Sequence, residues 1–342
     1  MRTRDTTDPL IHRLRLLARS SPALAPAARL YEAILPLLRD ADLHAAPILL
    51  TPGRIQEKLR QGVPLLLDMD LDIDVAAARE LMLKLAEAVA RSGKKSSGFP
   101  LRLPWIRSAA DDHAAALKIK AAVEKNTLDA GQLLFLIAAG KHSAVFATAA
   151  ERGLDPGLVL ALARNTLKPG LRAWRRLLVP LAEEVVWHSA ACFVCGAPAI
   201  LAELQGNDQA MHLRCGMCGS DWQVRRLRCV HCGNEDHRTL QNFTEDGSGD
   251  RMRVEVCDNC RGYIKVIAAF SPTSFEELAV ADLETLHLDY AAQGRGYSRS
   301  SNSPARTVPA HSAMVWTADV SVRPCVDGSL PRHPLSVLSS HA

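Results

Sequence analysis

Eight of the nine cysteines form four Cys-x-x-Cys pairs in the C-terminal half of the chain. The pairs are Cys192/Cys195, Cys215/Cys218, Cys229/Cys232 and Cys257/Cys260. Glycine directly follows three of the four second cysteines, and Arg261 and Gly262 follow the fourth. A two-residue gap closed by glycine forms a tight turn that directs both sulfurs to one point. Two such turns supply the four thiolates of a tetrahedral zinc or iron site.

The lengths of the linkers predict which pairs share a metal ion. The linkers have 19, 10 and 24 residues in chain order. A zinc ribbon joins its two pairs through a hairpin of roughly 15–20 residues, which the first and third linkers fit and the second does not. We therefore predict one site from the first two pairs and another from the last two. An interleaved arrangement, first with third and second with fourth, is the alternative.

Four thiolates leave a metal ion no open coordination position, so such sites stabilise structure and carry out no catalysis. Metal binding to small zinc fingers contributes roughly 10–16 kcal/mol, which is at least as large as the ~5–15 kcal/mol net stability of a whole domain. We predict two metal ions as cofactors, iron in rubredoxin-type sites or zinc, and we expect no enzyme activity.

Two other functions use similar cysteine patterns. Thiol–disulfide exchange needs a pair at a helix N-terminus in a βαβ setting, whereas these pairs lie between short strand-like segments. A nucleic-acid-binding ribbon needs a basic face with stacking aromatic side chains. The candidates for that face are Arg225, Arg226, Arg228, Arg251, Arg253, Arg261 and Lys265, with Trp222, Phe243 and Tyr263 nearby. We interpret them as a solvated positive face and small-core residues, and keep nucleic-acid binding as the alternative function.

Other polar residues are interpreted as structural. Eight thiolates suffice for two sites, so we expect roles outside the ligand sets for three nearby histidines, His212, His231 and His237. A row of alternating aspartates lacks the glycine and terminal glutamate of a calcium loop. We interpret it as the exposed approach to a helix; its members are Asp68, Asp70, Asp72 and Asp74. We find no phosphate-binding loop and no nucleophile motif.

Composition indicates a globular protein, and the expected cytoplasmic location implies a reducing compartment. Hydrophobic residues make up 48% of the chain, and 41 basic against 37 acidic side chains leave a formal charge of +4. That excess is too weak to imply a nucleic-acid partner. We see no signal peptide and no membrane span, and therefore expect a cytoplasmic protein without a membrane partner. Paired cysteines in that compartment indicate metal ligands and not disulfides.

The cysteine-free first half predicts a helical bundle. Apolar residues recur every three or four positions after Asp74, a good N-cap, up to about Ser92. Short connections between helices favour antiparallel neighbours. Further helices are predicted after Ser108, from Asp129 to Gly140, from His142 to Gly153, from Asp155 to about Asn165, and after Gly170.

The predicted fold class is α+β: an N-terminal helical bundle followed by two tandem rubredoxin-like or zinc-ribbon Cys₄ modules. We expect a helical domain over 1–188, a first ribbon over 189–224 and a second ribbon over 225–290. Short strands are predicted around 223–224, 239–243, 253–256 and 263–268, and a final acidic helix over 276–290. Residues 291–342, with the lone Cys325, are expected to be a largely disordered tail.

At this point the motifs resemble a known family. Residues from Trp187 to Trp222, Arg226 to Gly233, Glu255 to Lys265 and Gly296 to Arg299 are similar to FdhE, the formate dehydrogenase accessory protein. The similarity is specific over 187–299 and looser in the helical half, where 154–171 matches best. One departure is Phe193, which stands where the family usually has proline. The segment after about Asn302 has no family counterpart.

The resemblance implies a cytoplasmic maturation factor for respiratory formate dehydrogenase, with that enzyme's catalytic subunit as partner. It also implies that the eight paired cysteines are the family's metal ligands and that iron is associated with them. We hypothesise that Trp222, Arg226, Arg228, Tyr263 and the helix near Leu286 contact the partner. Formation of homo-oligomers is left open.

Overall fold

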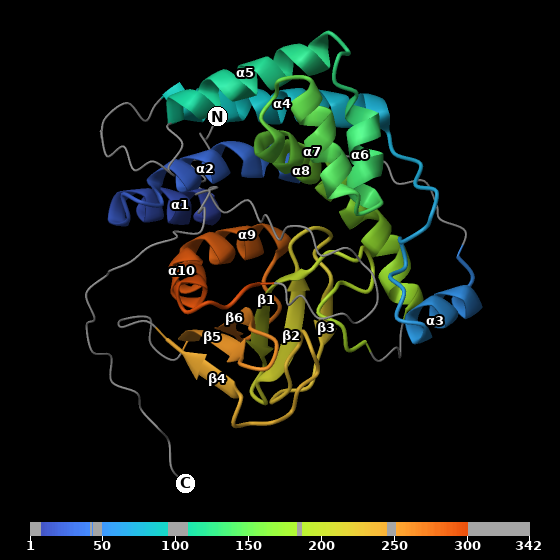
Figure 1. Ribbon diagram of the computed structural model, residues 1–342, viewed down its shortest axis with the longest axis vertical. Coiled ribbons are helices and arrows are strands. Elements are labelled where there is room, and N and C mark those ends of the chain that lie inside the picture. Colours follow the sequence, from blue (N-terminus) through green and yellow to red (C-terminus); the bar gives the residue numbers. More distant parts are fainter. Residues whose placement is uncertain are drawn as a thin grey trace, which may run out of the picture.

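The computed structural model describes residues 8–41, 43, 50–94, 109–182, 187–244 and 251–299. Helices occupy one end of the molecule and a sheet occupies the other (Figure 1). The helices of the first half are α1 (Pro9–Ser20), α2 (Ala25–Asp40), α3 (Pro52–Arg60), α4 (Val75–Lys94), α5 (Ala109–Glu124), α6 (Ala130–Ala138), α7 (His142–Glu151) and α8 (Pro156–Leu178), followed by the 3₁₀ turn η1 (Val179–Leu181).

Side-chain caps start several of these helices where the sequence predicts them. The Asp74 carboxylate accepts from the Ala77 amide at 2.9 Å, just ahead of α4. Asp129 and Asp155 cap α6 and α8 in the same way. Each cap satisfies an amide that the first helical turn leaves without a partner. The predicted starts of these helices are therefore confirmed.

Helix α8 differs from its prediction. We expected a helix ending near Asn165 and a second one after Gly170, but a single 23-residue helix runs through Pro169. Pro169 and Gly170 are buried in the middle of the bundle. Leu162, Leu171 and Trp174, on either side of the proline, belong to one hydrophobic core. Tertiary packing therefore outweighs the local cost of proline inside a helix.

The C-terminal half forms one six-stranded sheet in the order β3-β2-β1-β6-β5-β4. Its strands are β1 (Ala199–Gln205), β2 (Ala210–Cys215), β3 (Asp221–Gln223), β4 (Leu240–Phe243), β5 (Met252–Cys257) and β6 (Gly262–Ala269). The first three strands pair antiparallel, and so do the last three. Parallel pairing of β1 with β6 joins the two halves. The predicted fold class is confirmed, with both ribbons fused into a single sheet.

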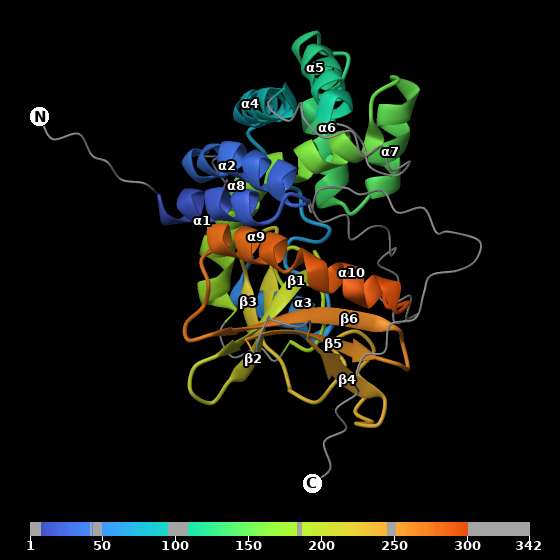
Figure 2. The ribbon, with the colours of Figure 1, turned by 90° about the vertical axis from the view of Figure 1, so that its left-hand side faces the viewer.

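Two short helices lie between the sheet and the bundle. The predicted helix over 276–290 is in fact two helices, α9 (Phe275–Glu284) and α10 (Leu286–Gly294), divided at Thr285. The Thr285 hydroxyl donates to the Ala281 carbonyl at 2.7 Å, where α9 ends. Figure 2 shows α9 and α10 above the sheet, with α1 and α2 on their other side. Structure thus continues past residue 290 to Arg299; residues 300–342 and Cys325 lie outside the described part.

The core does not stop at the boundary between helices and ribbons. One hydrophobic cluster includes Leu85 and Trp174 of the bundle together with Val194 and Leu213 of the first ribbon. A second cluster packs α1 and α2 against α9, with Leu14, Tyr31 and Leu283 among its members. Among the helices in the described ranges, none combines the length and apolar character that a membrane crossing requires.

A buried ionic network fastens the sheet to the two covering helices. Lys265 of β6 contacts Asp282 of α9 and Asp289 of α10, each at 2.7 Å. Arg299 contacts the same two carboxylates at 2.7 and 2.6 Å. The Tyr263 hydroxyl also donates to Asp289, at 2.7 Å. Two cations and two anions balance, which is what allows them to be buried.

Removing one member of this network should be costly, because it leaves a buried charge without its partner. We expect Asp289→Ala to lower the free energy of unfolding by about 3–5 kcal/mol. Glu80→Ala, which removes the exposed Lys84–Glu80 pair on α4, should change it by less than about 1 kcal/mol. Urea unfolding of both variants at matched metal content checks the difference. Equal stabilities would show that the network contributes nothing.

Candidate metal centres

Three of the four cysteine turns repeat one backbone pattern. In each, the amide four residues after the first cysteine donates to that cysteine's carbonyl, at 2.8–3.0 Å. The first cysteine's amide donates to the carbonyl five residues on, at 2.8–2.9 Å. The donor in the first of these bonds is a glycine with positive φ, a conformation that glycine adopts without steric cost. These glycines are Gly196, Gly219 and Gly233.

The fourth turn reaches the same shape without glycine at that place. Arg261 has φ +56°, and its side chain is held on two sides. It pairs with Asp258 at 2.9 Å and lies over the Tyr297 ring, 3.9 Å from the centroid. Gly262 follows because a Cβ there would lie 2.7 Å from the His231 ring. These contacts of the Arg261 side chain offset the steric cost of its positive φ, a cost that the glycines of the other three turns avoid.

The first candidate centre consists of Cys192, Cys195, Cys215 and Cys218, whose sulfurs all lie within 4.8 Å of one another. Two sulfur–sulfur distances, Cys192 to Cys218 and Cys195 to Cys215, are 3.5 Å. A tetrahedron with metal–sulfur bonds of about 2.3 Å has edges of about 3.8 Å. The four sulfurs are therefore nearly at the spacing that a zinc or iron ion requires.

The second candidate centre consists of Cys229, Cys232, Cys257 and Cys260, again within 4.8 Å of one another. Here the distances are 3.6 Å between Cys229 and Cys260 and 3.8 Å between Cys232 and Cys257. The pairing predicted from the linker lengths is confirmed, and the interleaved alternative is wrong. The strand-like linkers of 19 and 24 residues form the hairpins β1–β2 and β4–β5.

Nearby donors direct hydrogen atoms at the sulfurs, as thiolates require. At the first centre, the amides of Val194, Met217 and Cys218 each lie 3.4 Å from a cysteine sulfur. At the second, the side-chain amides of Asn234 and Asn259 lie 3.7 Å from the sulfurs of Cys257 and Cys232. Donors of this kind stabilise the negative charge of metal-bound sulfur.

The pKa values differ among the thiols of the two centres. Despite burial, hydrogen bonds lower the pKa of Cys215 and lower that of Cys232 to about 7, whereas the pKa values of others are raised. Burial raises the pKa of Cys218 well above its ordinary value and raises the pKa of Cys260 to about 11. Hydrogen bonding to Cys192 raises the pKa of Cys195. Near neutral pH Cys195, Cys218 and Cys260 are therefore thiols until a cation binds and takes the place of their protons.

The histidines lie outside both ligand sets, as expected. Among the described residues, the groups that could hold a metal ion are the two sets of four cysteines. His231 contacts the Tyr263 carbonyl through Nε2 at 3.0 Å, and burial lowers its pKa, which favours a neutral ring that donates this bond. His212 pairs with Asp221 on the neighbouring strand, and His237 is exposed.

Two hypothesised partner contacts are wrong because their side chains are in the core: Trp222 and Tyr263 are 6% and 1% exposed. A contact through the helix near Leu286 stays a prediction; Leu286 itself is buried, and Tyr290 of the same helix is 43% exposed. Trp222 instead donates to the Ser189 carbonyl at 3.1 Å. Arg226 is exposed and Arg228 is half-buried. Sequence reasoning missed Leu227 and Phe270, both 81% exposed; the neighbours of Leu227 in sequence, Arg226 and Arg228, are the one signal that could have pointed to it.

The two centres differ in what surrounds them. The first turn lies against the bundle: the amides of Leu65 and Leu66 donate to the carbonyls of Phe193 and Val194, at 2.8 and 2.9 Å. The second centre faces a cavity of about 390 Å³ lined by ribbon residues, including Leu227 and Cys229. The first centre is thus a joint between the two halves of the molecule, and the second belongs to the sheet.

Two cations of α8 lie beside the first centre. Arg164 and Lys168 line a small cavity together with Gly216 and Met217 of the second cysteine turn. Burial lowers the pKa of Arg164, and the nearby Cys195 and Cys215 act in the opposite direction. Burial also lowers the pKa of Lys168 to about 8. Neither cation has a carboxylate partner among the ion pairs of the described residues. Four thiolates around a divalent ion carry a net double negative charge, which these cations would balance.

A helical bundle joined to tandem zinc-ribbon-like modules is the class of protein that the fold and the cysteine geometry define. Comparison with known proteins is more specific. Residues 227–305 match the family model described as the C-terminal domain of FdhE. That range includes the second centre, α9 and α10.

Individual relatives carry the same name. "Protein FdhE" of Escherichia coli is 33% identical over 115 residues, 33% of this chain and 36% of that protein. A "Protein FdhE homolog" of Shewanella baltica is 27% identical over 134 residues, 38% of this chain and 44% of the relative. The matched segments thus span less than half of these relatives.

A crystal structure of the FdhE protein from Pseudomonas aeruginosa resembles this fold, with a TM-score of 0.51 and 23% sequence identity. The match covers 85% of this chain and 92% of that one. At this identity the likeness concerns the fold. Together, the family model, the curated relatives and the solved structure confirm the predicted resemblance to the FdhE family.

Metal removal should loosen more than the ribbons, because the first centre is joined to the bundle. We expect chelation to increase hydrogen exchange at the Leu65 and Leu66 amides, whose acceptors are carbonyls of the first cysteine turn. The Ala77 amide, capped by Asp74 within the bundle, should keep its protection. Exchange measured by NMR or mass spectrometry with and without chelator checks this. Unchanged protection of Leu65 and Leu66 would show that the turn keeps its shape without metal.

Neutralising the two cations of α8 should weaken metal retention at one centre only. In Arg164→Gln/Lys168→Met, we expect one of two metal ions to be lost to a chromogenic chelator roughly tenfold faster, the effect of about 1.4 kcal/mol of lost Coulomb attraction. Arg176→Gln removes an exposed charge from the same helix and is the matched control. If both metal ions were released equally fast from the double variant, Arg164 and Lys168 would not act specifically on the first centre.

Proposed function

We propose that this protein is a cytoplasmic accessory factor for formate dehydrogenase, and that its metal-stabilised C-terminal half binds the catalytic subunit of that enzyme. The observation that supports this most directly is the pair of closed four-cysteine groups within a fold of the FdhE type. The second group lies inside the segment that matches the FdhE family model. The similarity to FdhE suggests the partner. The two four-cysteine groups, once they hold metal, would give the C-terminal half a stable surface for binding that partner.

Closed cysteine groups suit a binding role better than a catalytic one. All four ligands of each group come from the protein, which leaves a zinc or iron ion no position for substrate. Thiol–disulfide exchange is also disfavoured, because the cysteines lie in turns beside strands and not at helix N-termini. We therefore propose that the protein is not an enzyme, and that its two metal ions keep the docking surface in shape.

The charge distribution argues against the nucleic-acid alternative. The basic side chains considered for a nucleic-acid face lie close to carboxylates: Arg253 to Glu255 at 2.6 Å, Arg261 to Asp258 at 2.9 Å, and Arg228 to Glu235 at 3.7 Å. Lys265 is 1% exposed and bound in the ionic network. The aromatic rings that would stack on bases are buried or, at Phe243, covered by Arg295. Phosphates would meet few free cations here.

The proposal predicts that the cysteines of the second centre are needed for partner binding and that Cys325, which belongs to no Cys-x-x-Cys pair, is not. Cys229→Ser/Cys232→Ser should abolish copurification of the formate dehydrogenase catalytic subunit, because the second centre then loses two of its four ligands. In a host that lacks its own accessory factor, formate dehydrogenase activity should be lower with this double variant than with the native protein. The control is Cys325→Ser, which removes the cysteine outside the four pairs.

Metal analysis of the same preparations makes the outcome decisive. The native protein should contain two metal ions per chain after anaerobic purification, and an absorption spectrum separates coloured iron–thiolate centres from colourless zinc centres. The double serine variant should contain one ion. If that variant lost its metal yet copurified fully with the catalytic subunit, the second centre would have no part in docking.

A further inference from the structure

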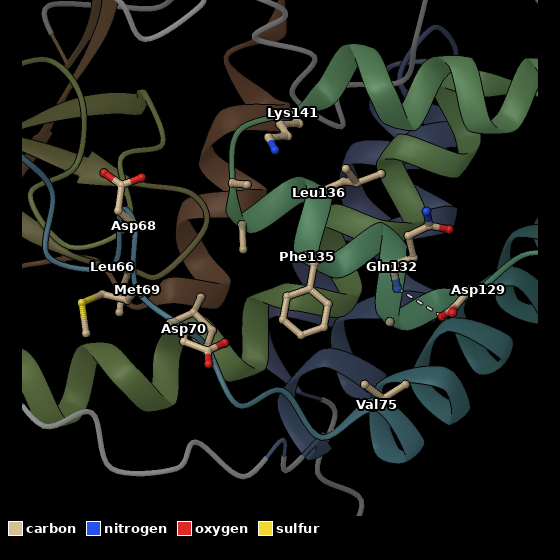
Figure 3. Close-up of a pocket in the computed structure, with 14 residues that line it drawn as sticks. Leu66, Asp68, Met69, Asp70, Val75, Asp129, Gln132, Phe135, Leu136 and Lys141 are labelled. Atoms are coloured by element: carbon tan, nitrogen blue, oxygen red, sulfur yellow. Dashed lines mark hydrogen bonds between the residues drawn. The ribbon is translucent and has the colours of Figure 1, made fainter.

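A groove on the helical half, far in sequence from the cysteines, has the chemistry of a binding site. It lies between the segment that leads into α4 and helix α6, and its volume is about 730 Å³. Its lining includes Asp68, Asp70, Val75, Phe135 and Lys141. We call it the acidic groove. Figure 3 shows Asp68, Met69 and Asp70 along one wall, with Phe135, Gln132 and Asp129 along the other.

The lining of the acidic groove exposes large apolar side chains. Phe135 is 46% exposed and Val75 is 40% exposed, both large for side chains placed next to a packed core. Their neighbours Leu134 and Ile137 on α6 are buried, so α6 presents an apolar face to the groove as well as to the core. Contiguous exposed apolar surface with a polar rim is typical of a docking site.

The rim of the groove carries an excess of negative charge. Asp68 and Asp70 are exposed; neither is in an ion pair of the described residues, and the charge of Lys58 acts on Asp68. Asp129 also lines the groove and caps α6 through the Gln132 amide at 3.1 Å. Lys141 is the single basic residue in the lining. These carboxylates do not converge as metal ligands do, since the convergent groups in the described ranges are the two cysteine sets.

The backbone of the acidic wall is fixed, which favours a formed site over a loop that adapts. Lys58 donates to the Leu67 carbonyl at 2.6 Å, and Asp68 adopts φ +59°, a conformation that aspartate tolerates better than most residues. On the other side of this segment, Leu65 and Leu66 bond to the first cysteine turn. The first cysteine turn therefore supports one wall of the groove.

We propose that the acidic groove binds an extended segment of the partner polypeptide that carries arginine or lysine beside apolar side chains. The carboxylates of Asp68 and Asp70 would receive its cations, and Phe135 and Val75 would receive its apolar groups. The proposal rests on the proposed function for the existence of a polypeptide partner. It adds a second contact surface, on the helical half, to the one formed by the ribbons.

The direct test uses full-length protein and a defined probe. A fluorescein-labelled peptide of alternating Leu and Arg should bind with an affinity that falls as salt is raised, and the same peptide with Glu in place of Arg should bind much more weakly. In Asp68→Asn/Asp70→Asn, affinity for the Arg peptide should fall roughly fivefold or more, the effect of two partly exposed charge pairs. Phe135→Ala should lower the affinity for the Arg peptide at low and at high salt alike, because it removes apolar contact and no charge.

A charge-matched control makes the test specific to the groove. Asp40→Asn/Asp208→Asn removes two exposed carboxylates elsewhere on the molecule and should leave peptide affinity unchanged. The proposal is overturned if both double variants lose affinity equally, or if the Glu peptide binds as well as the Arg peptide. It is also overturned if the groove variants change the oligomeric state of the free protein, because a second copy then covers the groove.

Copurification separates this proposal from the proposed function. Asp68→Asn/Asp70→Asn should retain two metal ions and lose part of its copurifying catalytic subunit. If the catalytic subunit binds undiminished while the peptide fails to bind, the groove is not a docking site but the accessory function stands. If the peptide binds through the groove and the catalytic subunit never copurifies, the groove is a peptide site and the proposed partner is wrong.

Discussion

The convergence of four sulfurs at one end of the hairpin in each ribbon is the constraint on which the C-terminal half depends. Neither ribbon has a large apolar core of its own; a small cluster in the second ribbon consists of Val254, Val256 and Tyr263 with Leu288 and Ala292 of α10. The first ribbon instead places Cys192, Cys215 and Cys218 in the main core. A metal ion that holds such turns contributes roughly 10–16 kcal/mol, and without it several buried thiols keep their protons and lack any link between turns.

Fusion of the ribbons turns two small modules into one body. Each repeats the order turn, hairpin, turn, strand, and the first strand of one pairs in parallel with the last strand of the other. Parallel neighbours need covering on their faces, and α9 and α10 lie over this part of the sheet (Figure 2). The ionic network of Lys265, Asp282, Asp289 and Arg299 then fixes the cover to the sheet, which explains why residues past 290 belong to the folded part.

Local signals predicted what is locally determined. The spacing of the cysteines and the linker lengths were enough to predict which cysteines lie together in fours, because a cysteine turn and a hairpin are short-range structures. Caps at Asp74, Asp129 and Asp155 placed three helices. The Asp155-Pro156 signal, an acidic or hydroxyl residue before proline, also opens α1 at Asp8 and α3 at Thr51, where it was overlooked. Two long-range features escaped prediction: the β1–β6 pairing and the passage of α8 through Pro169 both depend on which surfaces meet.

The weak net charge of the chain conceals an uneven distribution, and this bears on where a partner can bind. On the ribbons, arginines lie beside carboxylates within the same module, so the surface there is locally balanced. On the helical half, the groove has more carboxylates than cations: Asp68 and Asp70 lie beside exposed Phe135, with Lys141 in the lining and Lys58 near Asp68. Arg164 and Lys168 line the small cavity beside the first centre. These two cations thus lie where they would balance the charge of four thiolates around a metal ion, and the carboxylates lie at the acidic groove on the outside. The first cysteine turn supports the groove wall through Leu65 and Leu66, so the first centre and the groove are parts of one structural unit.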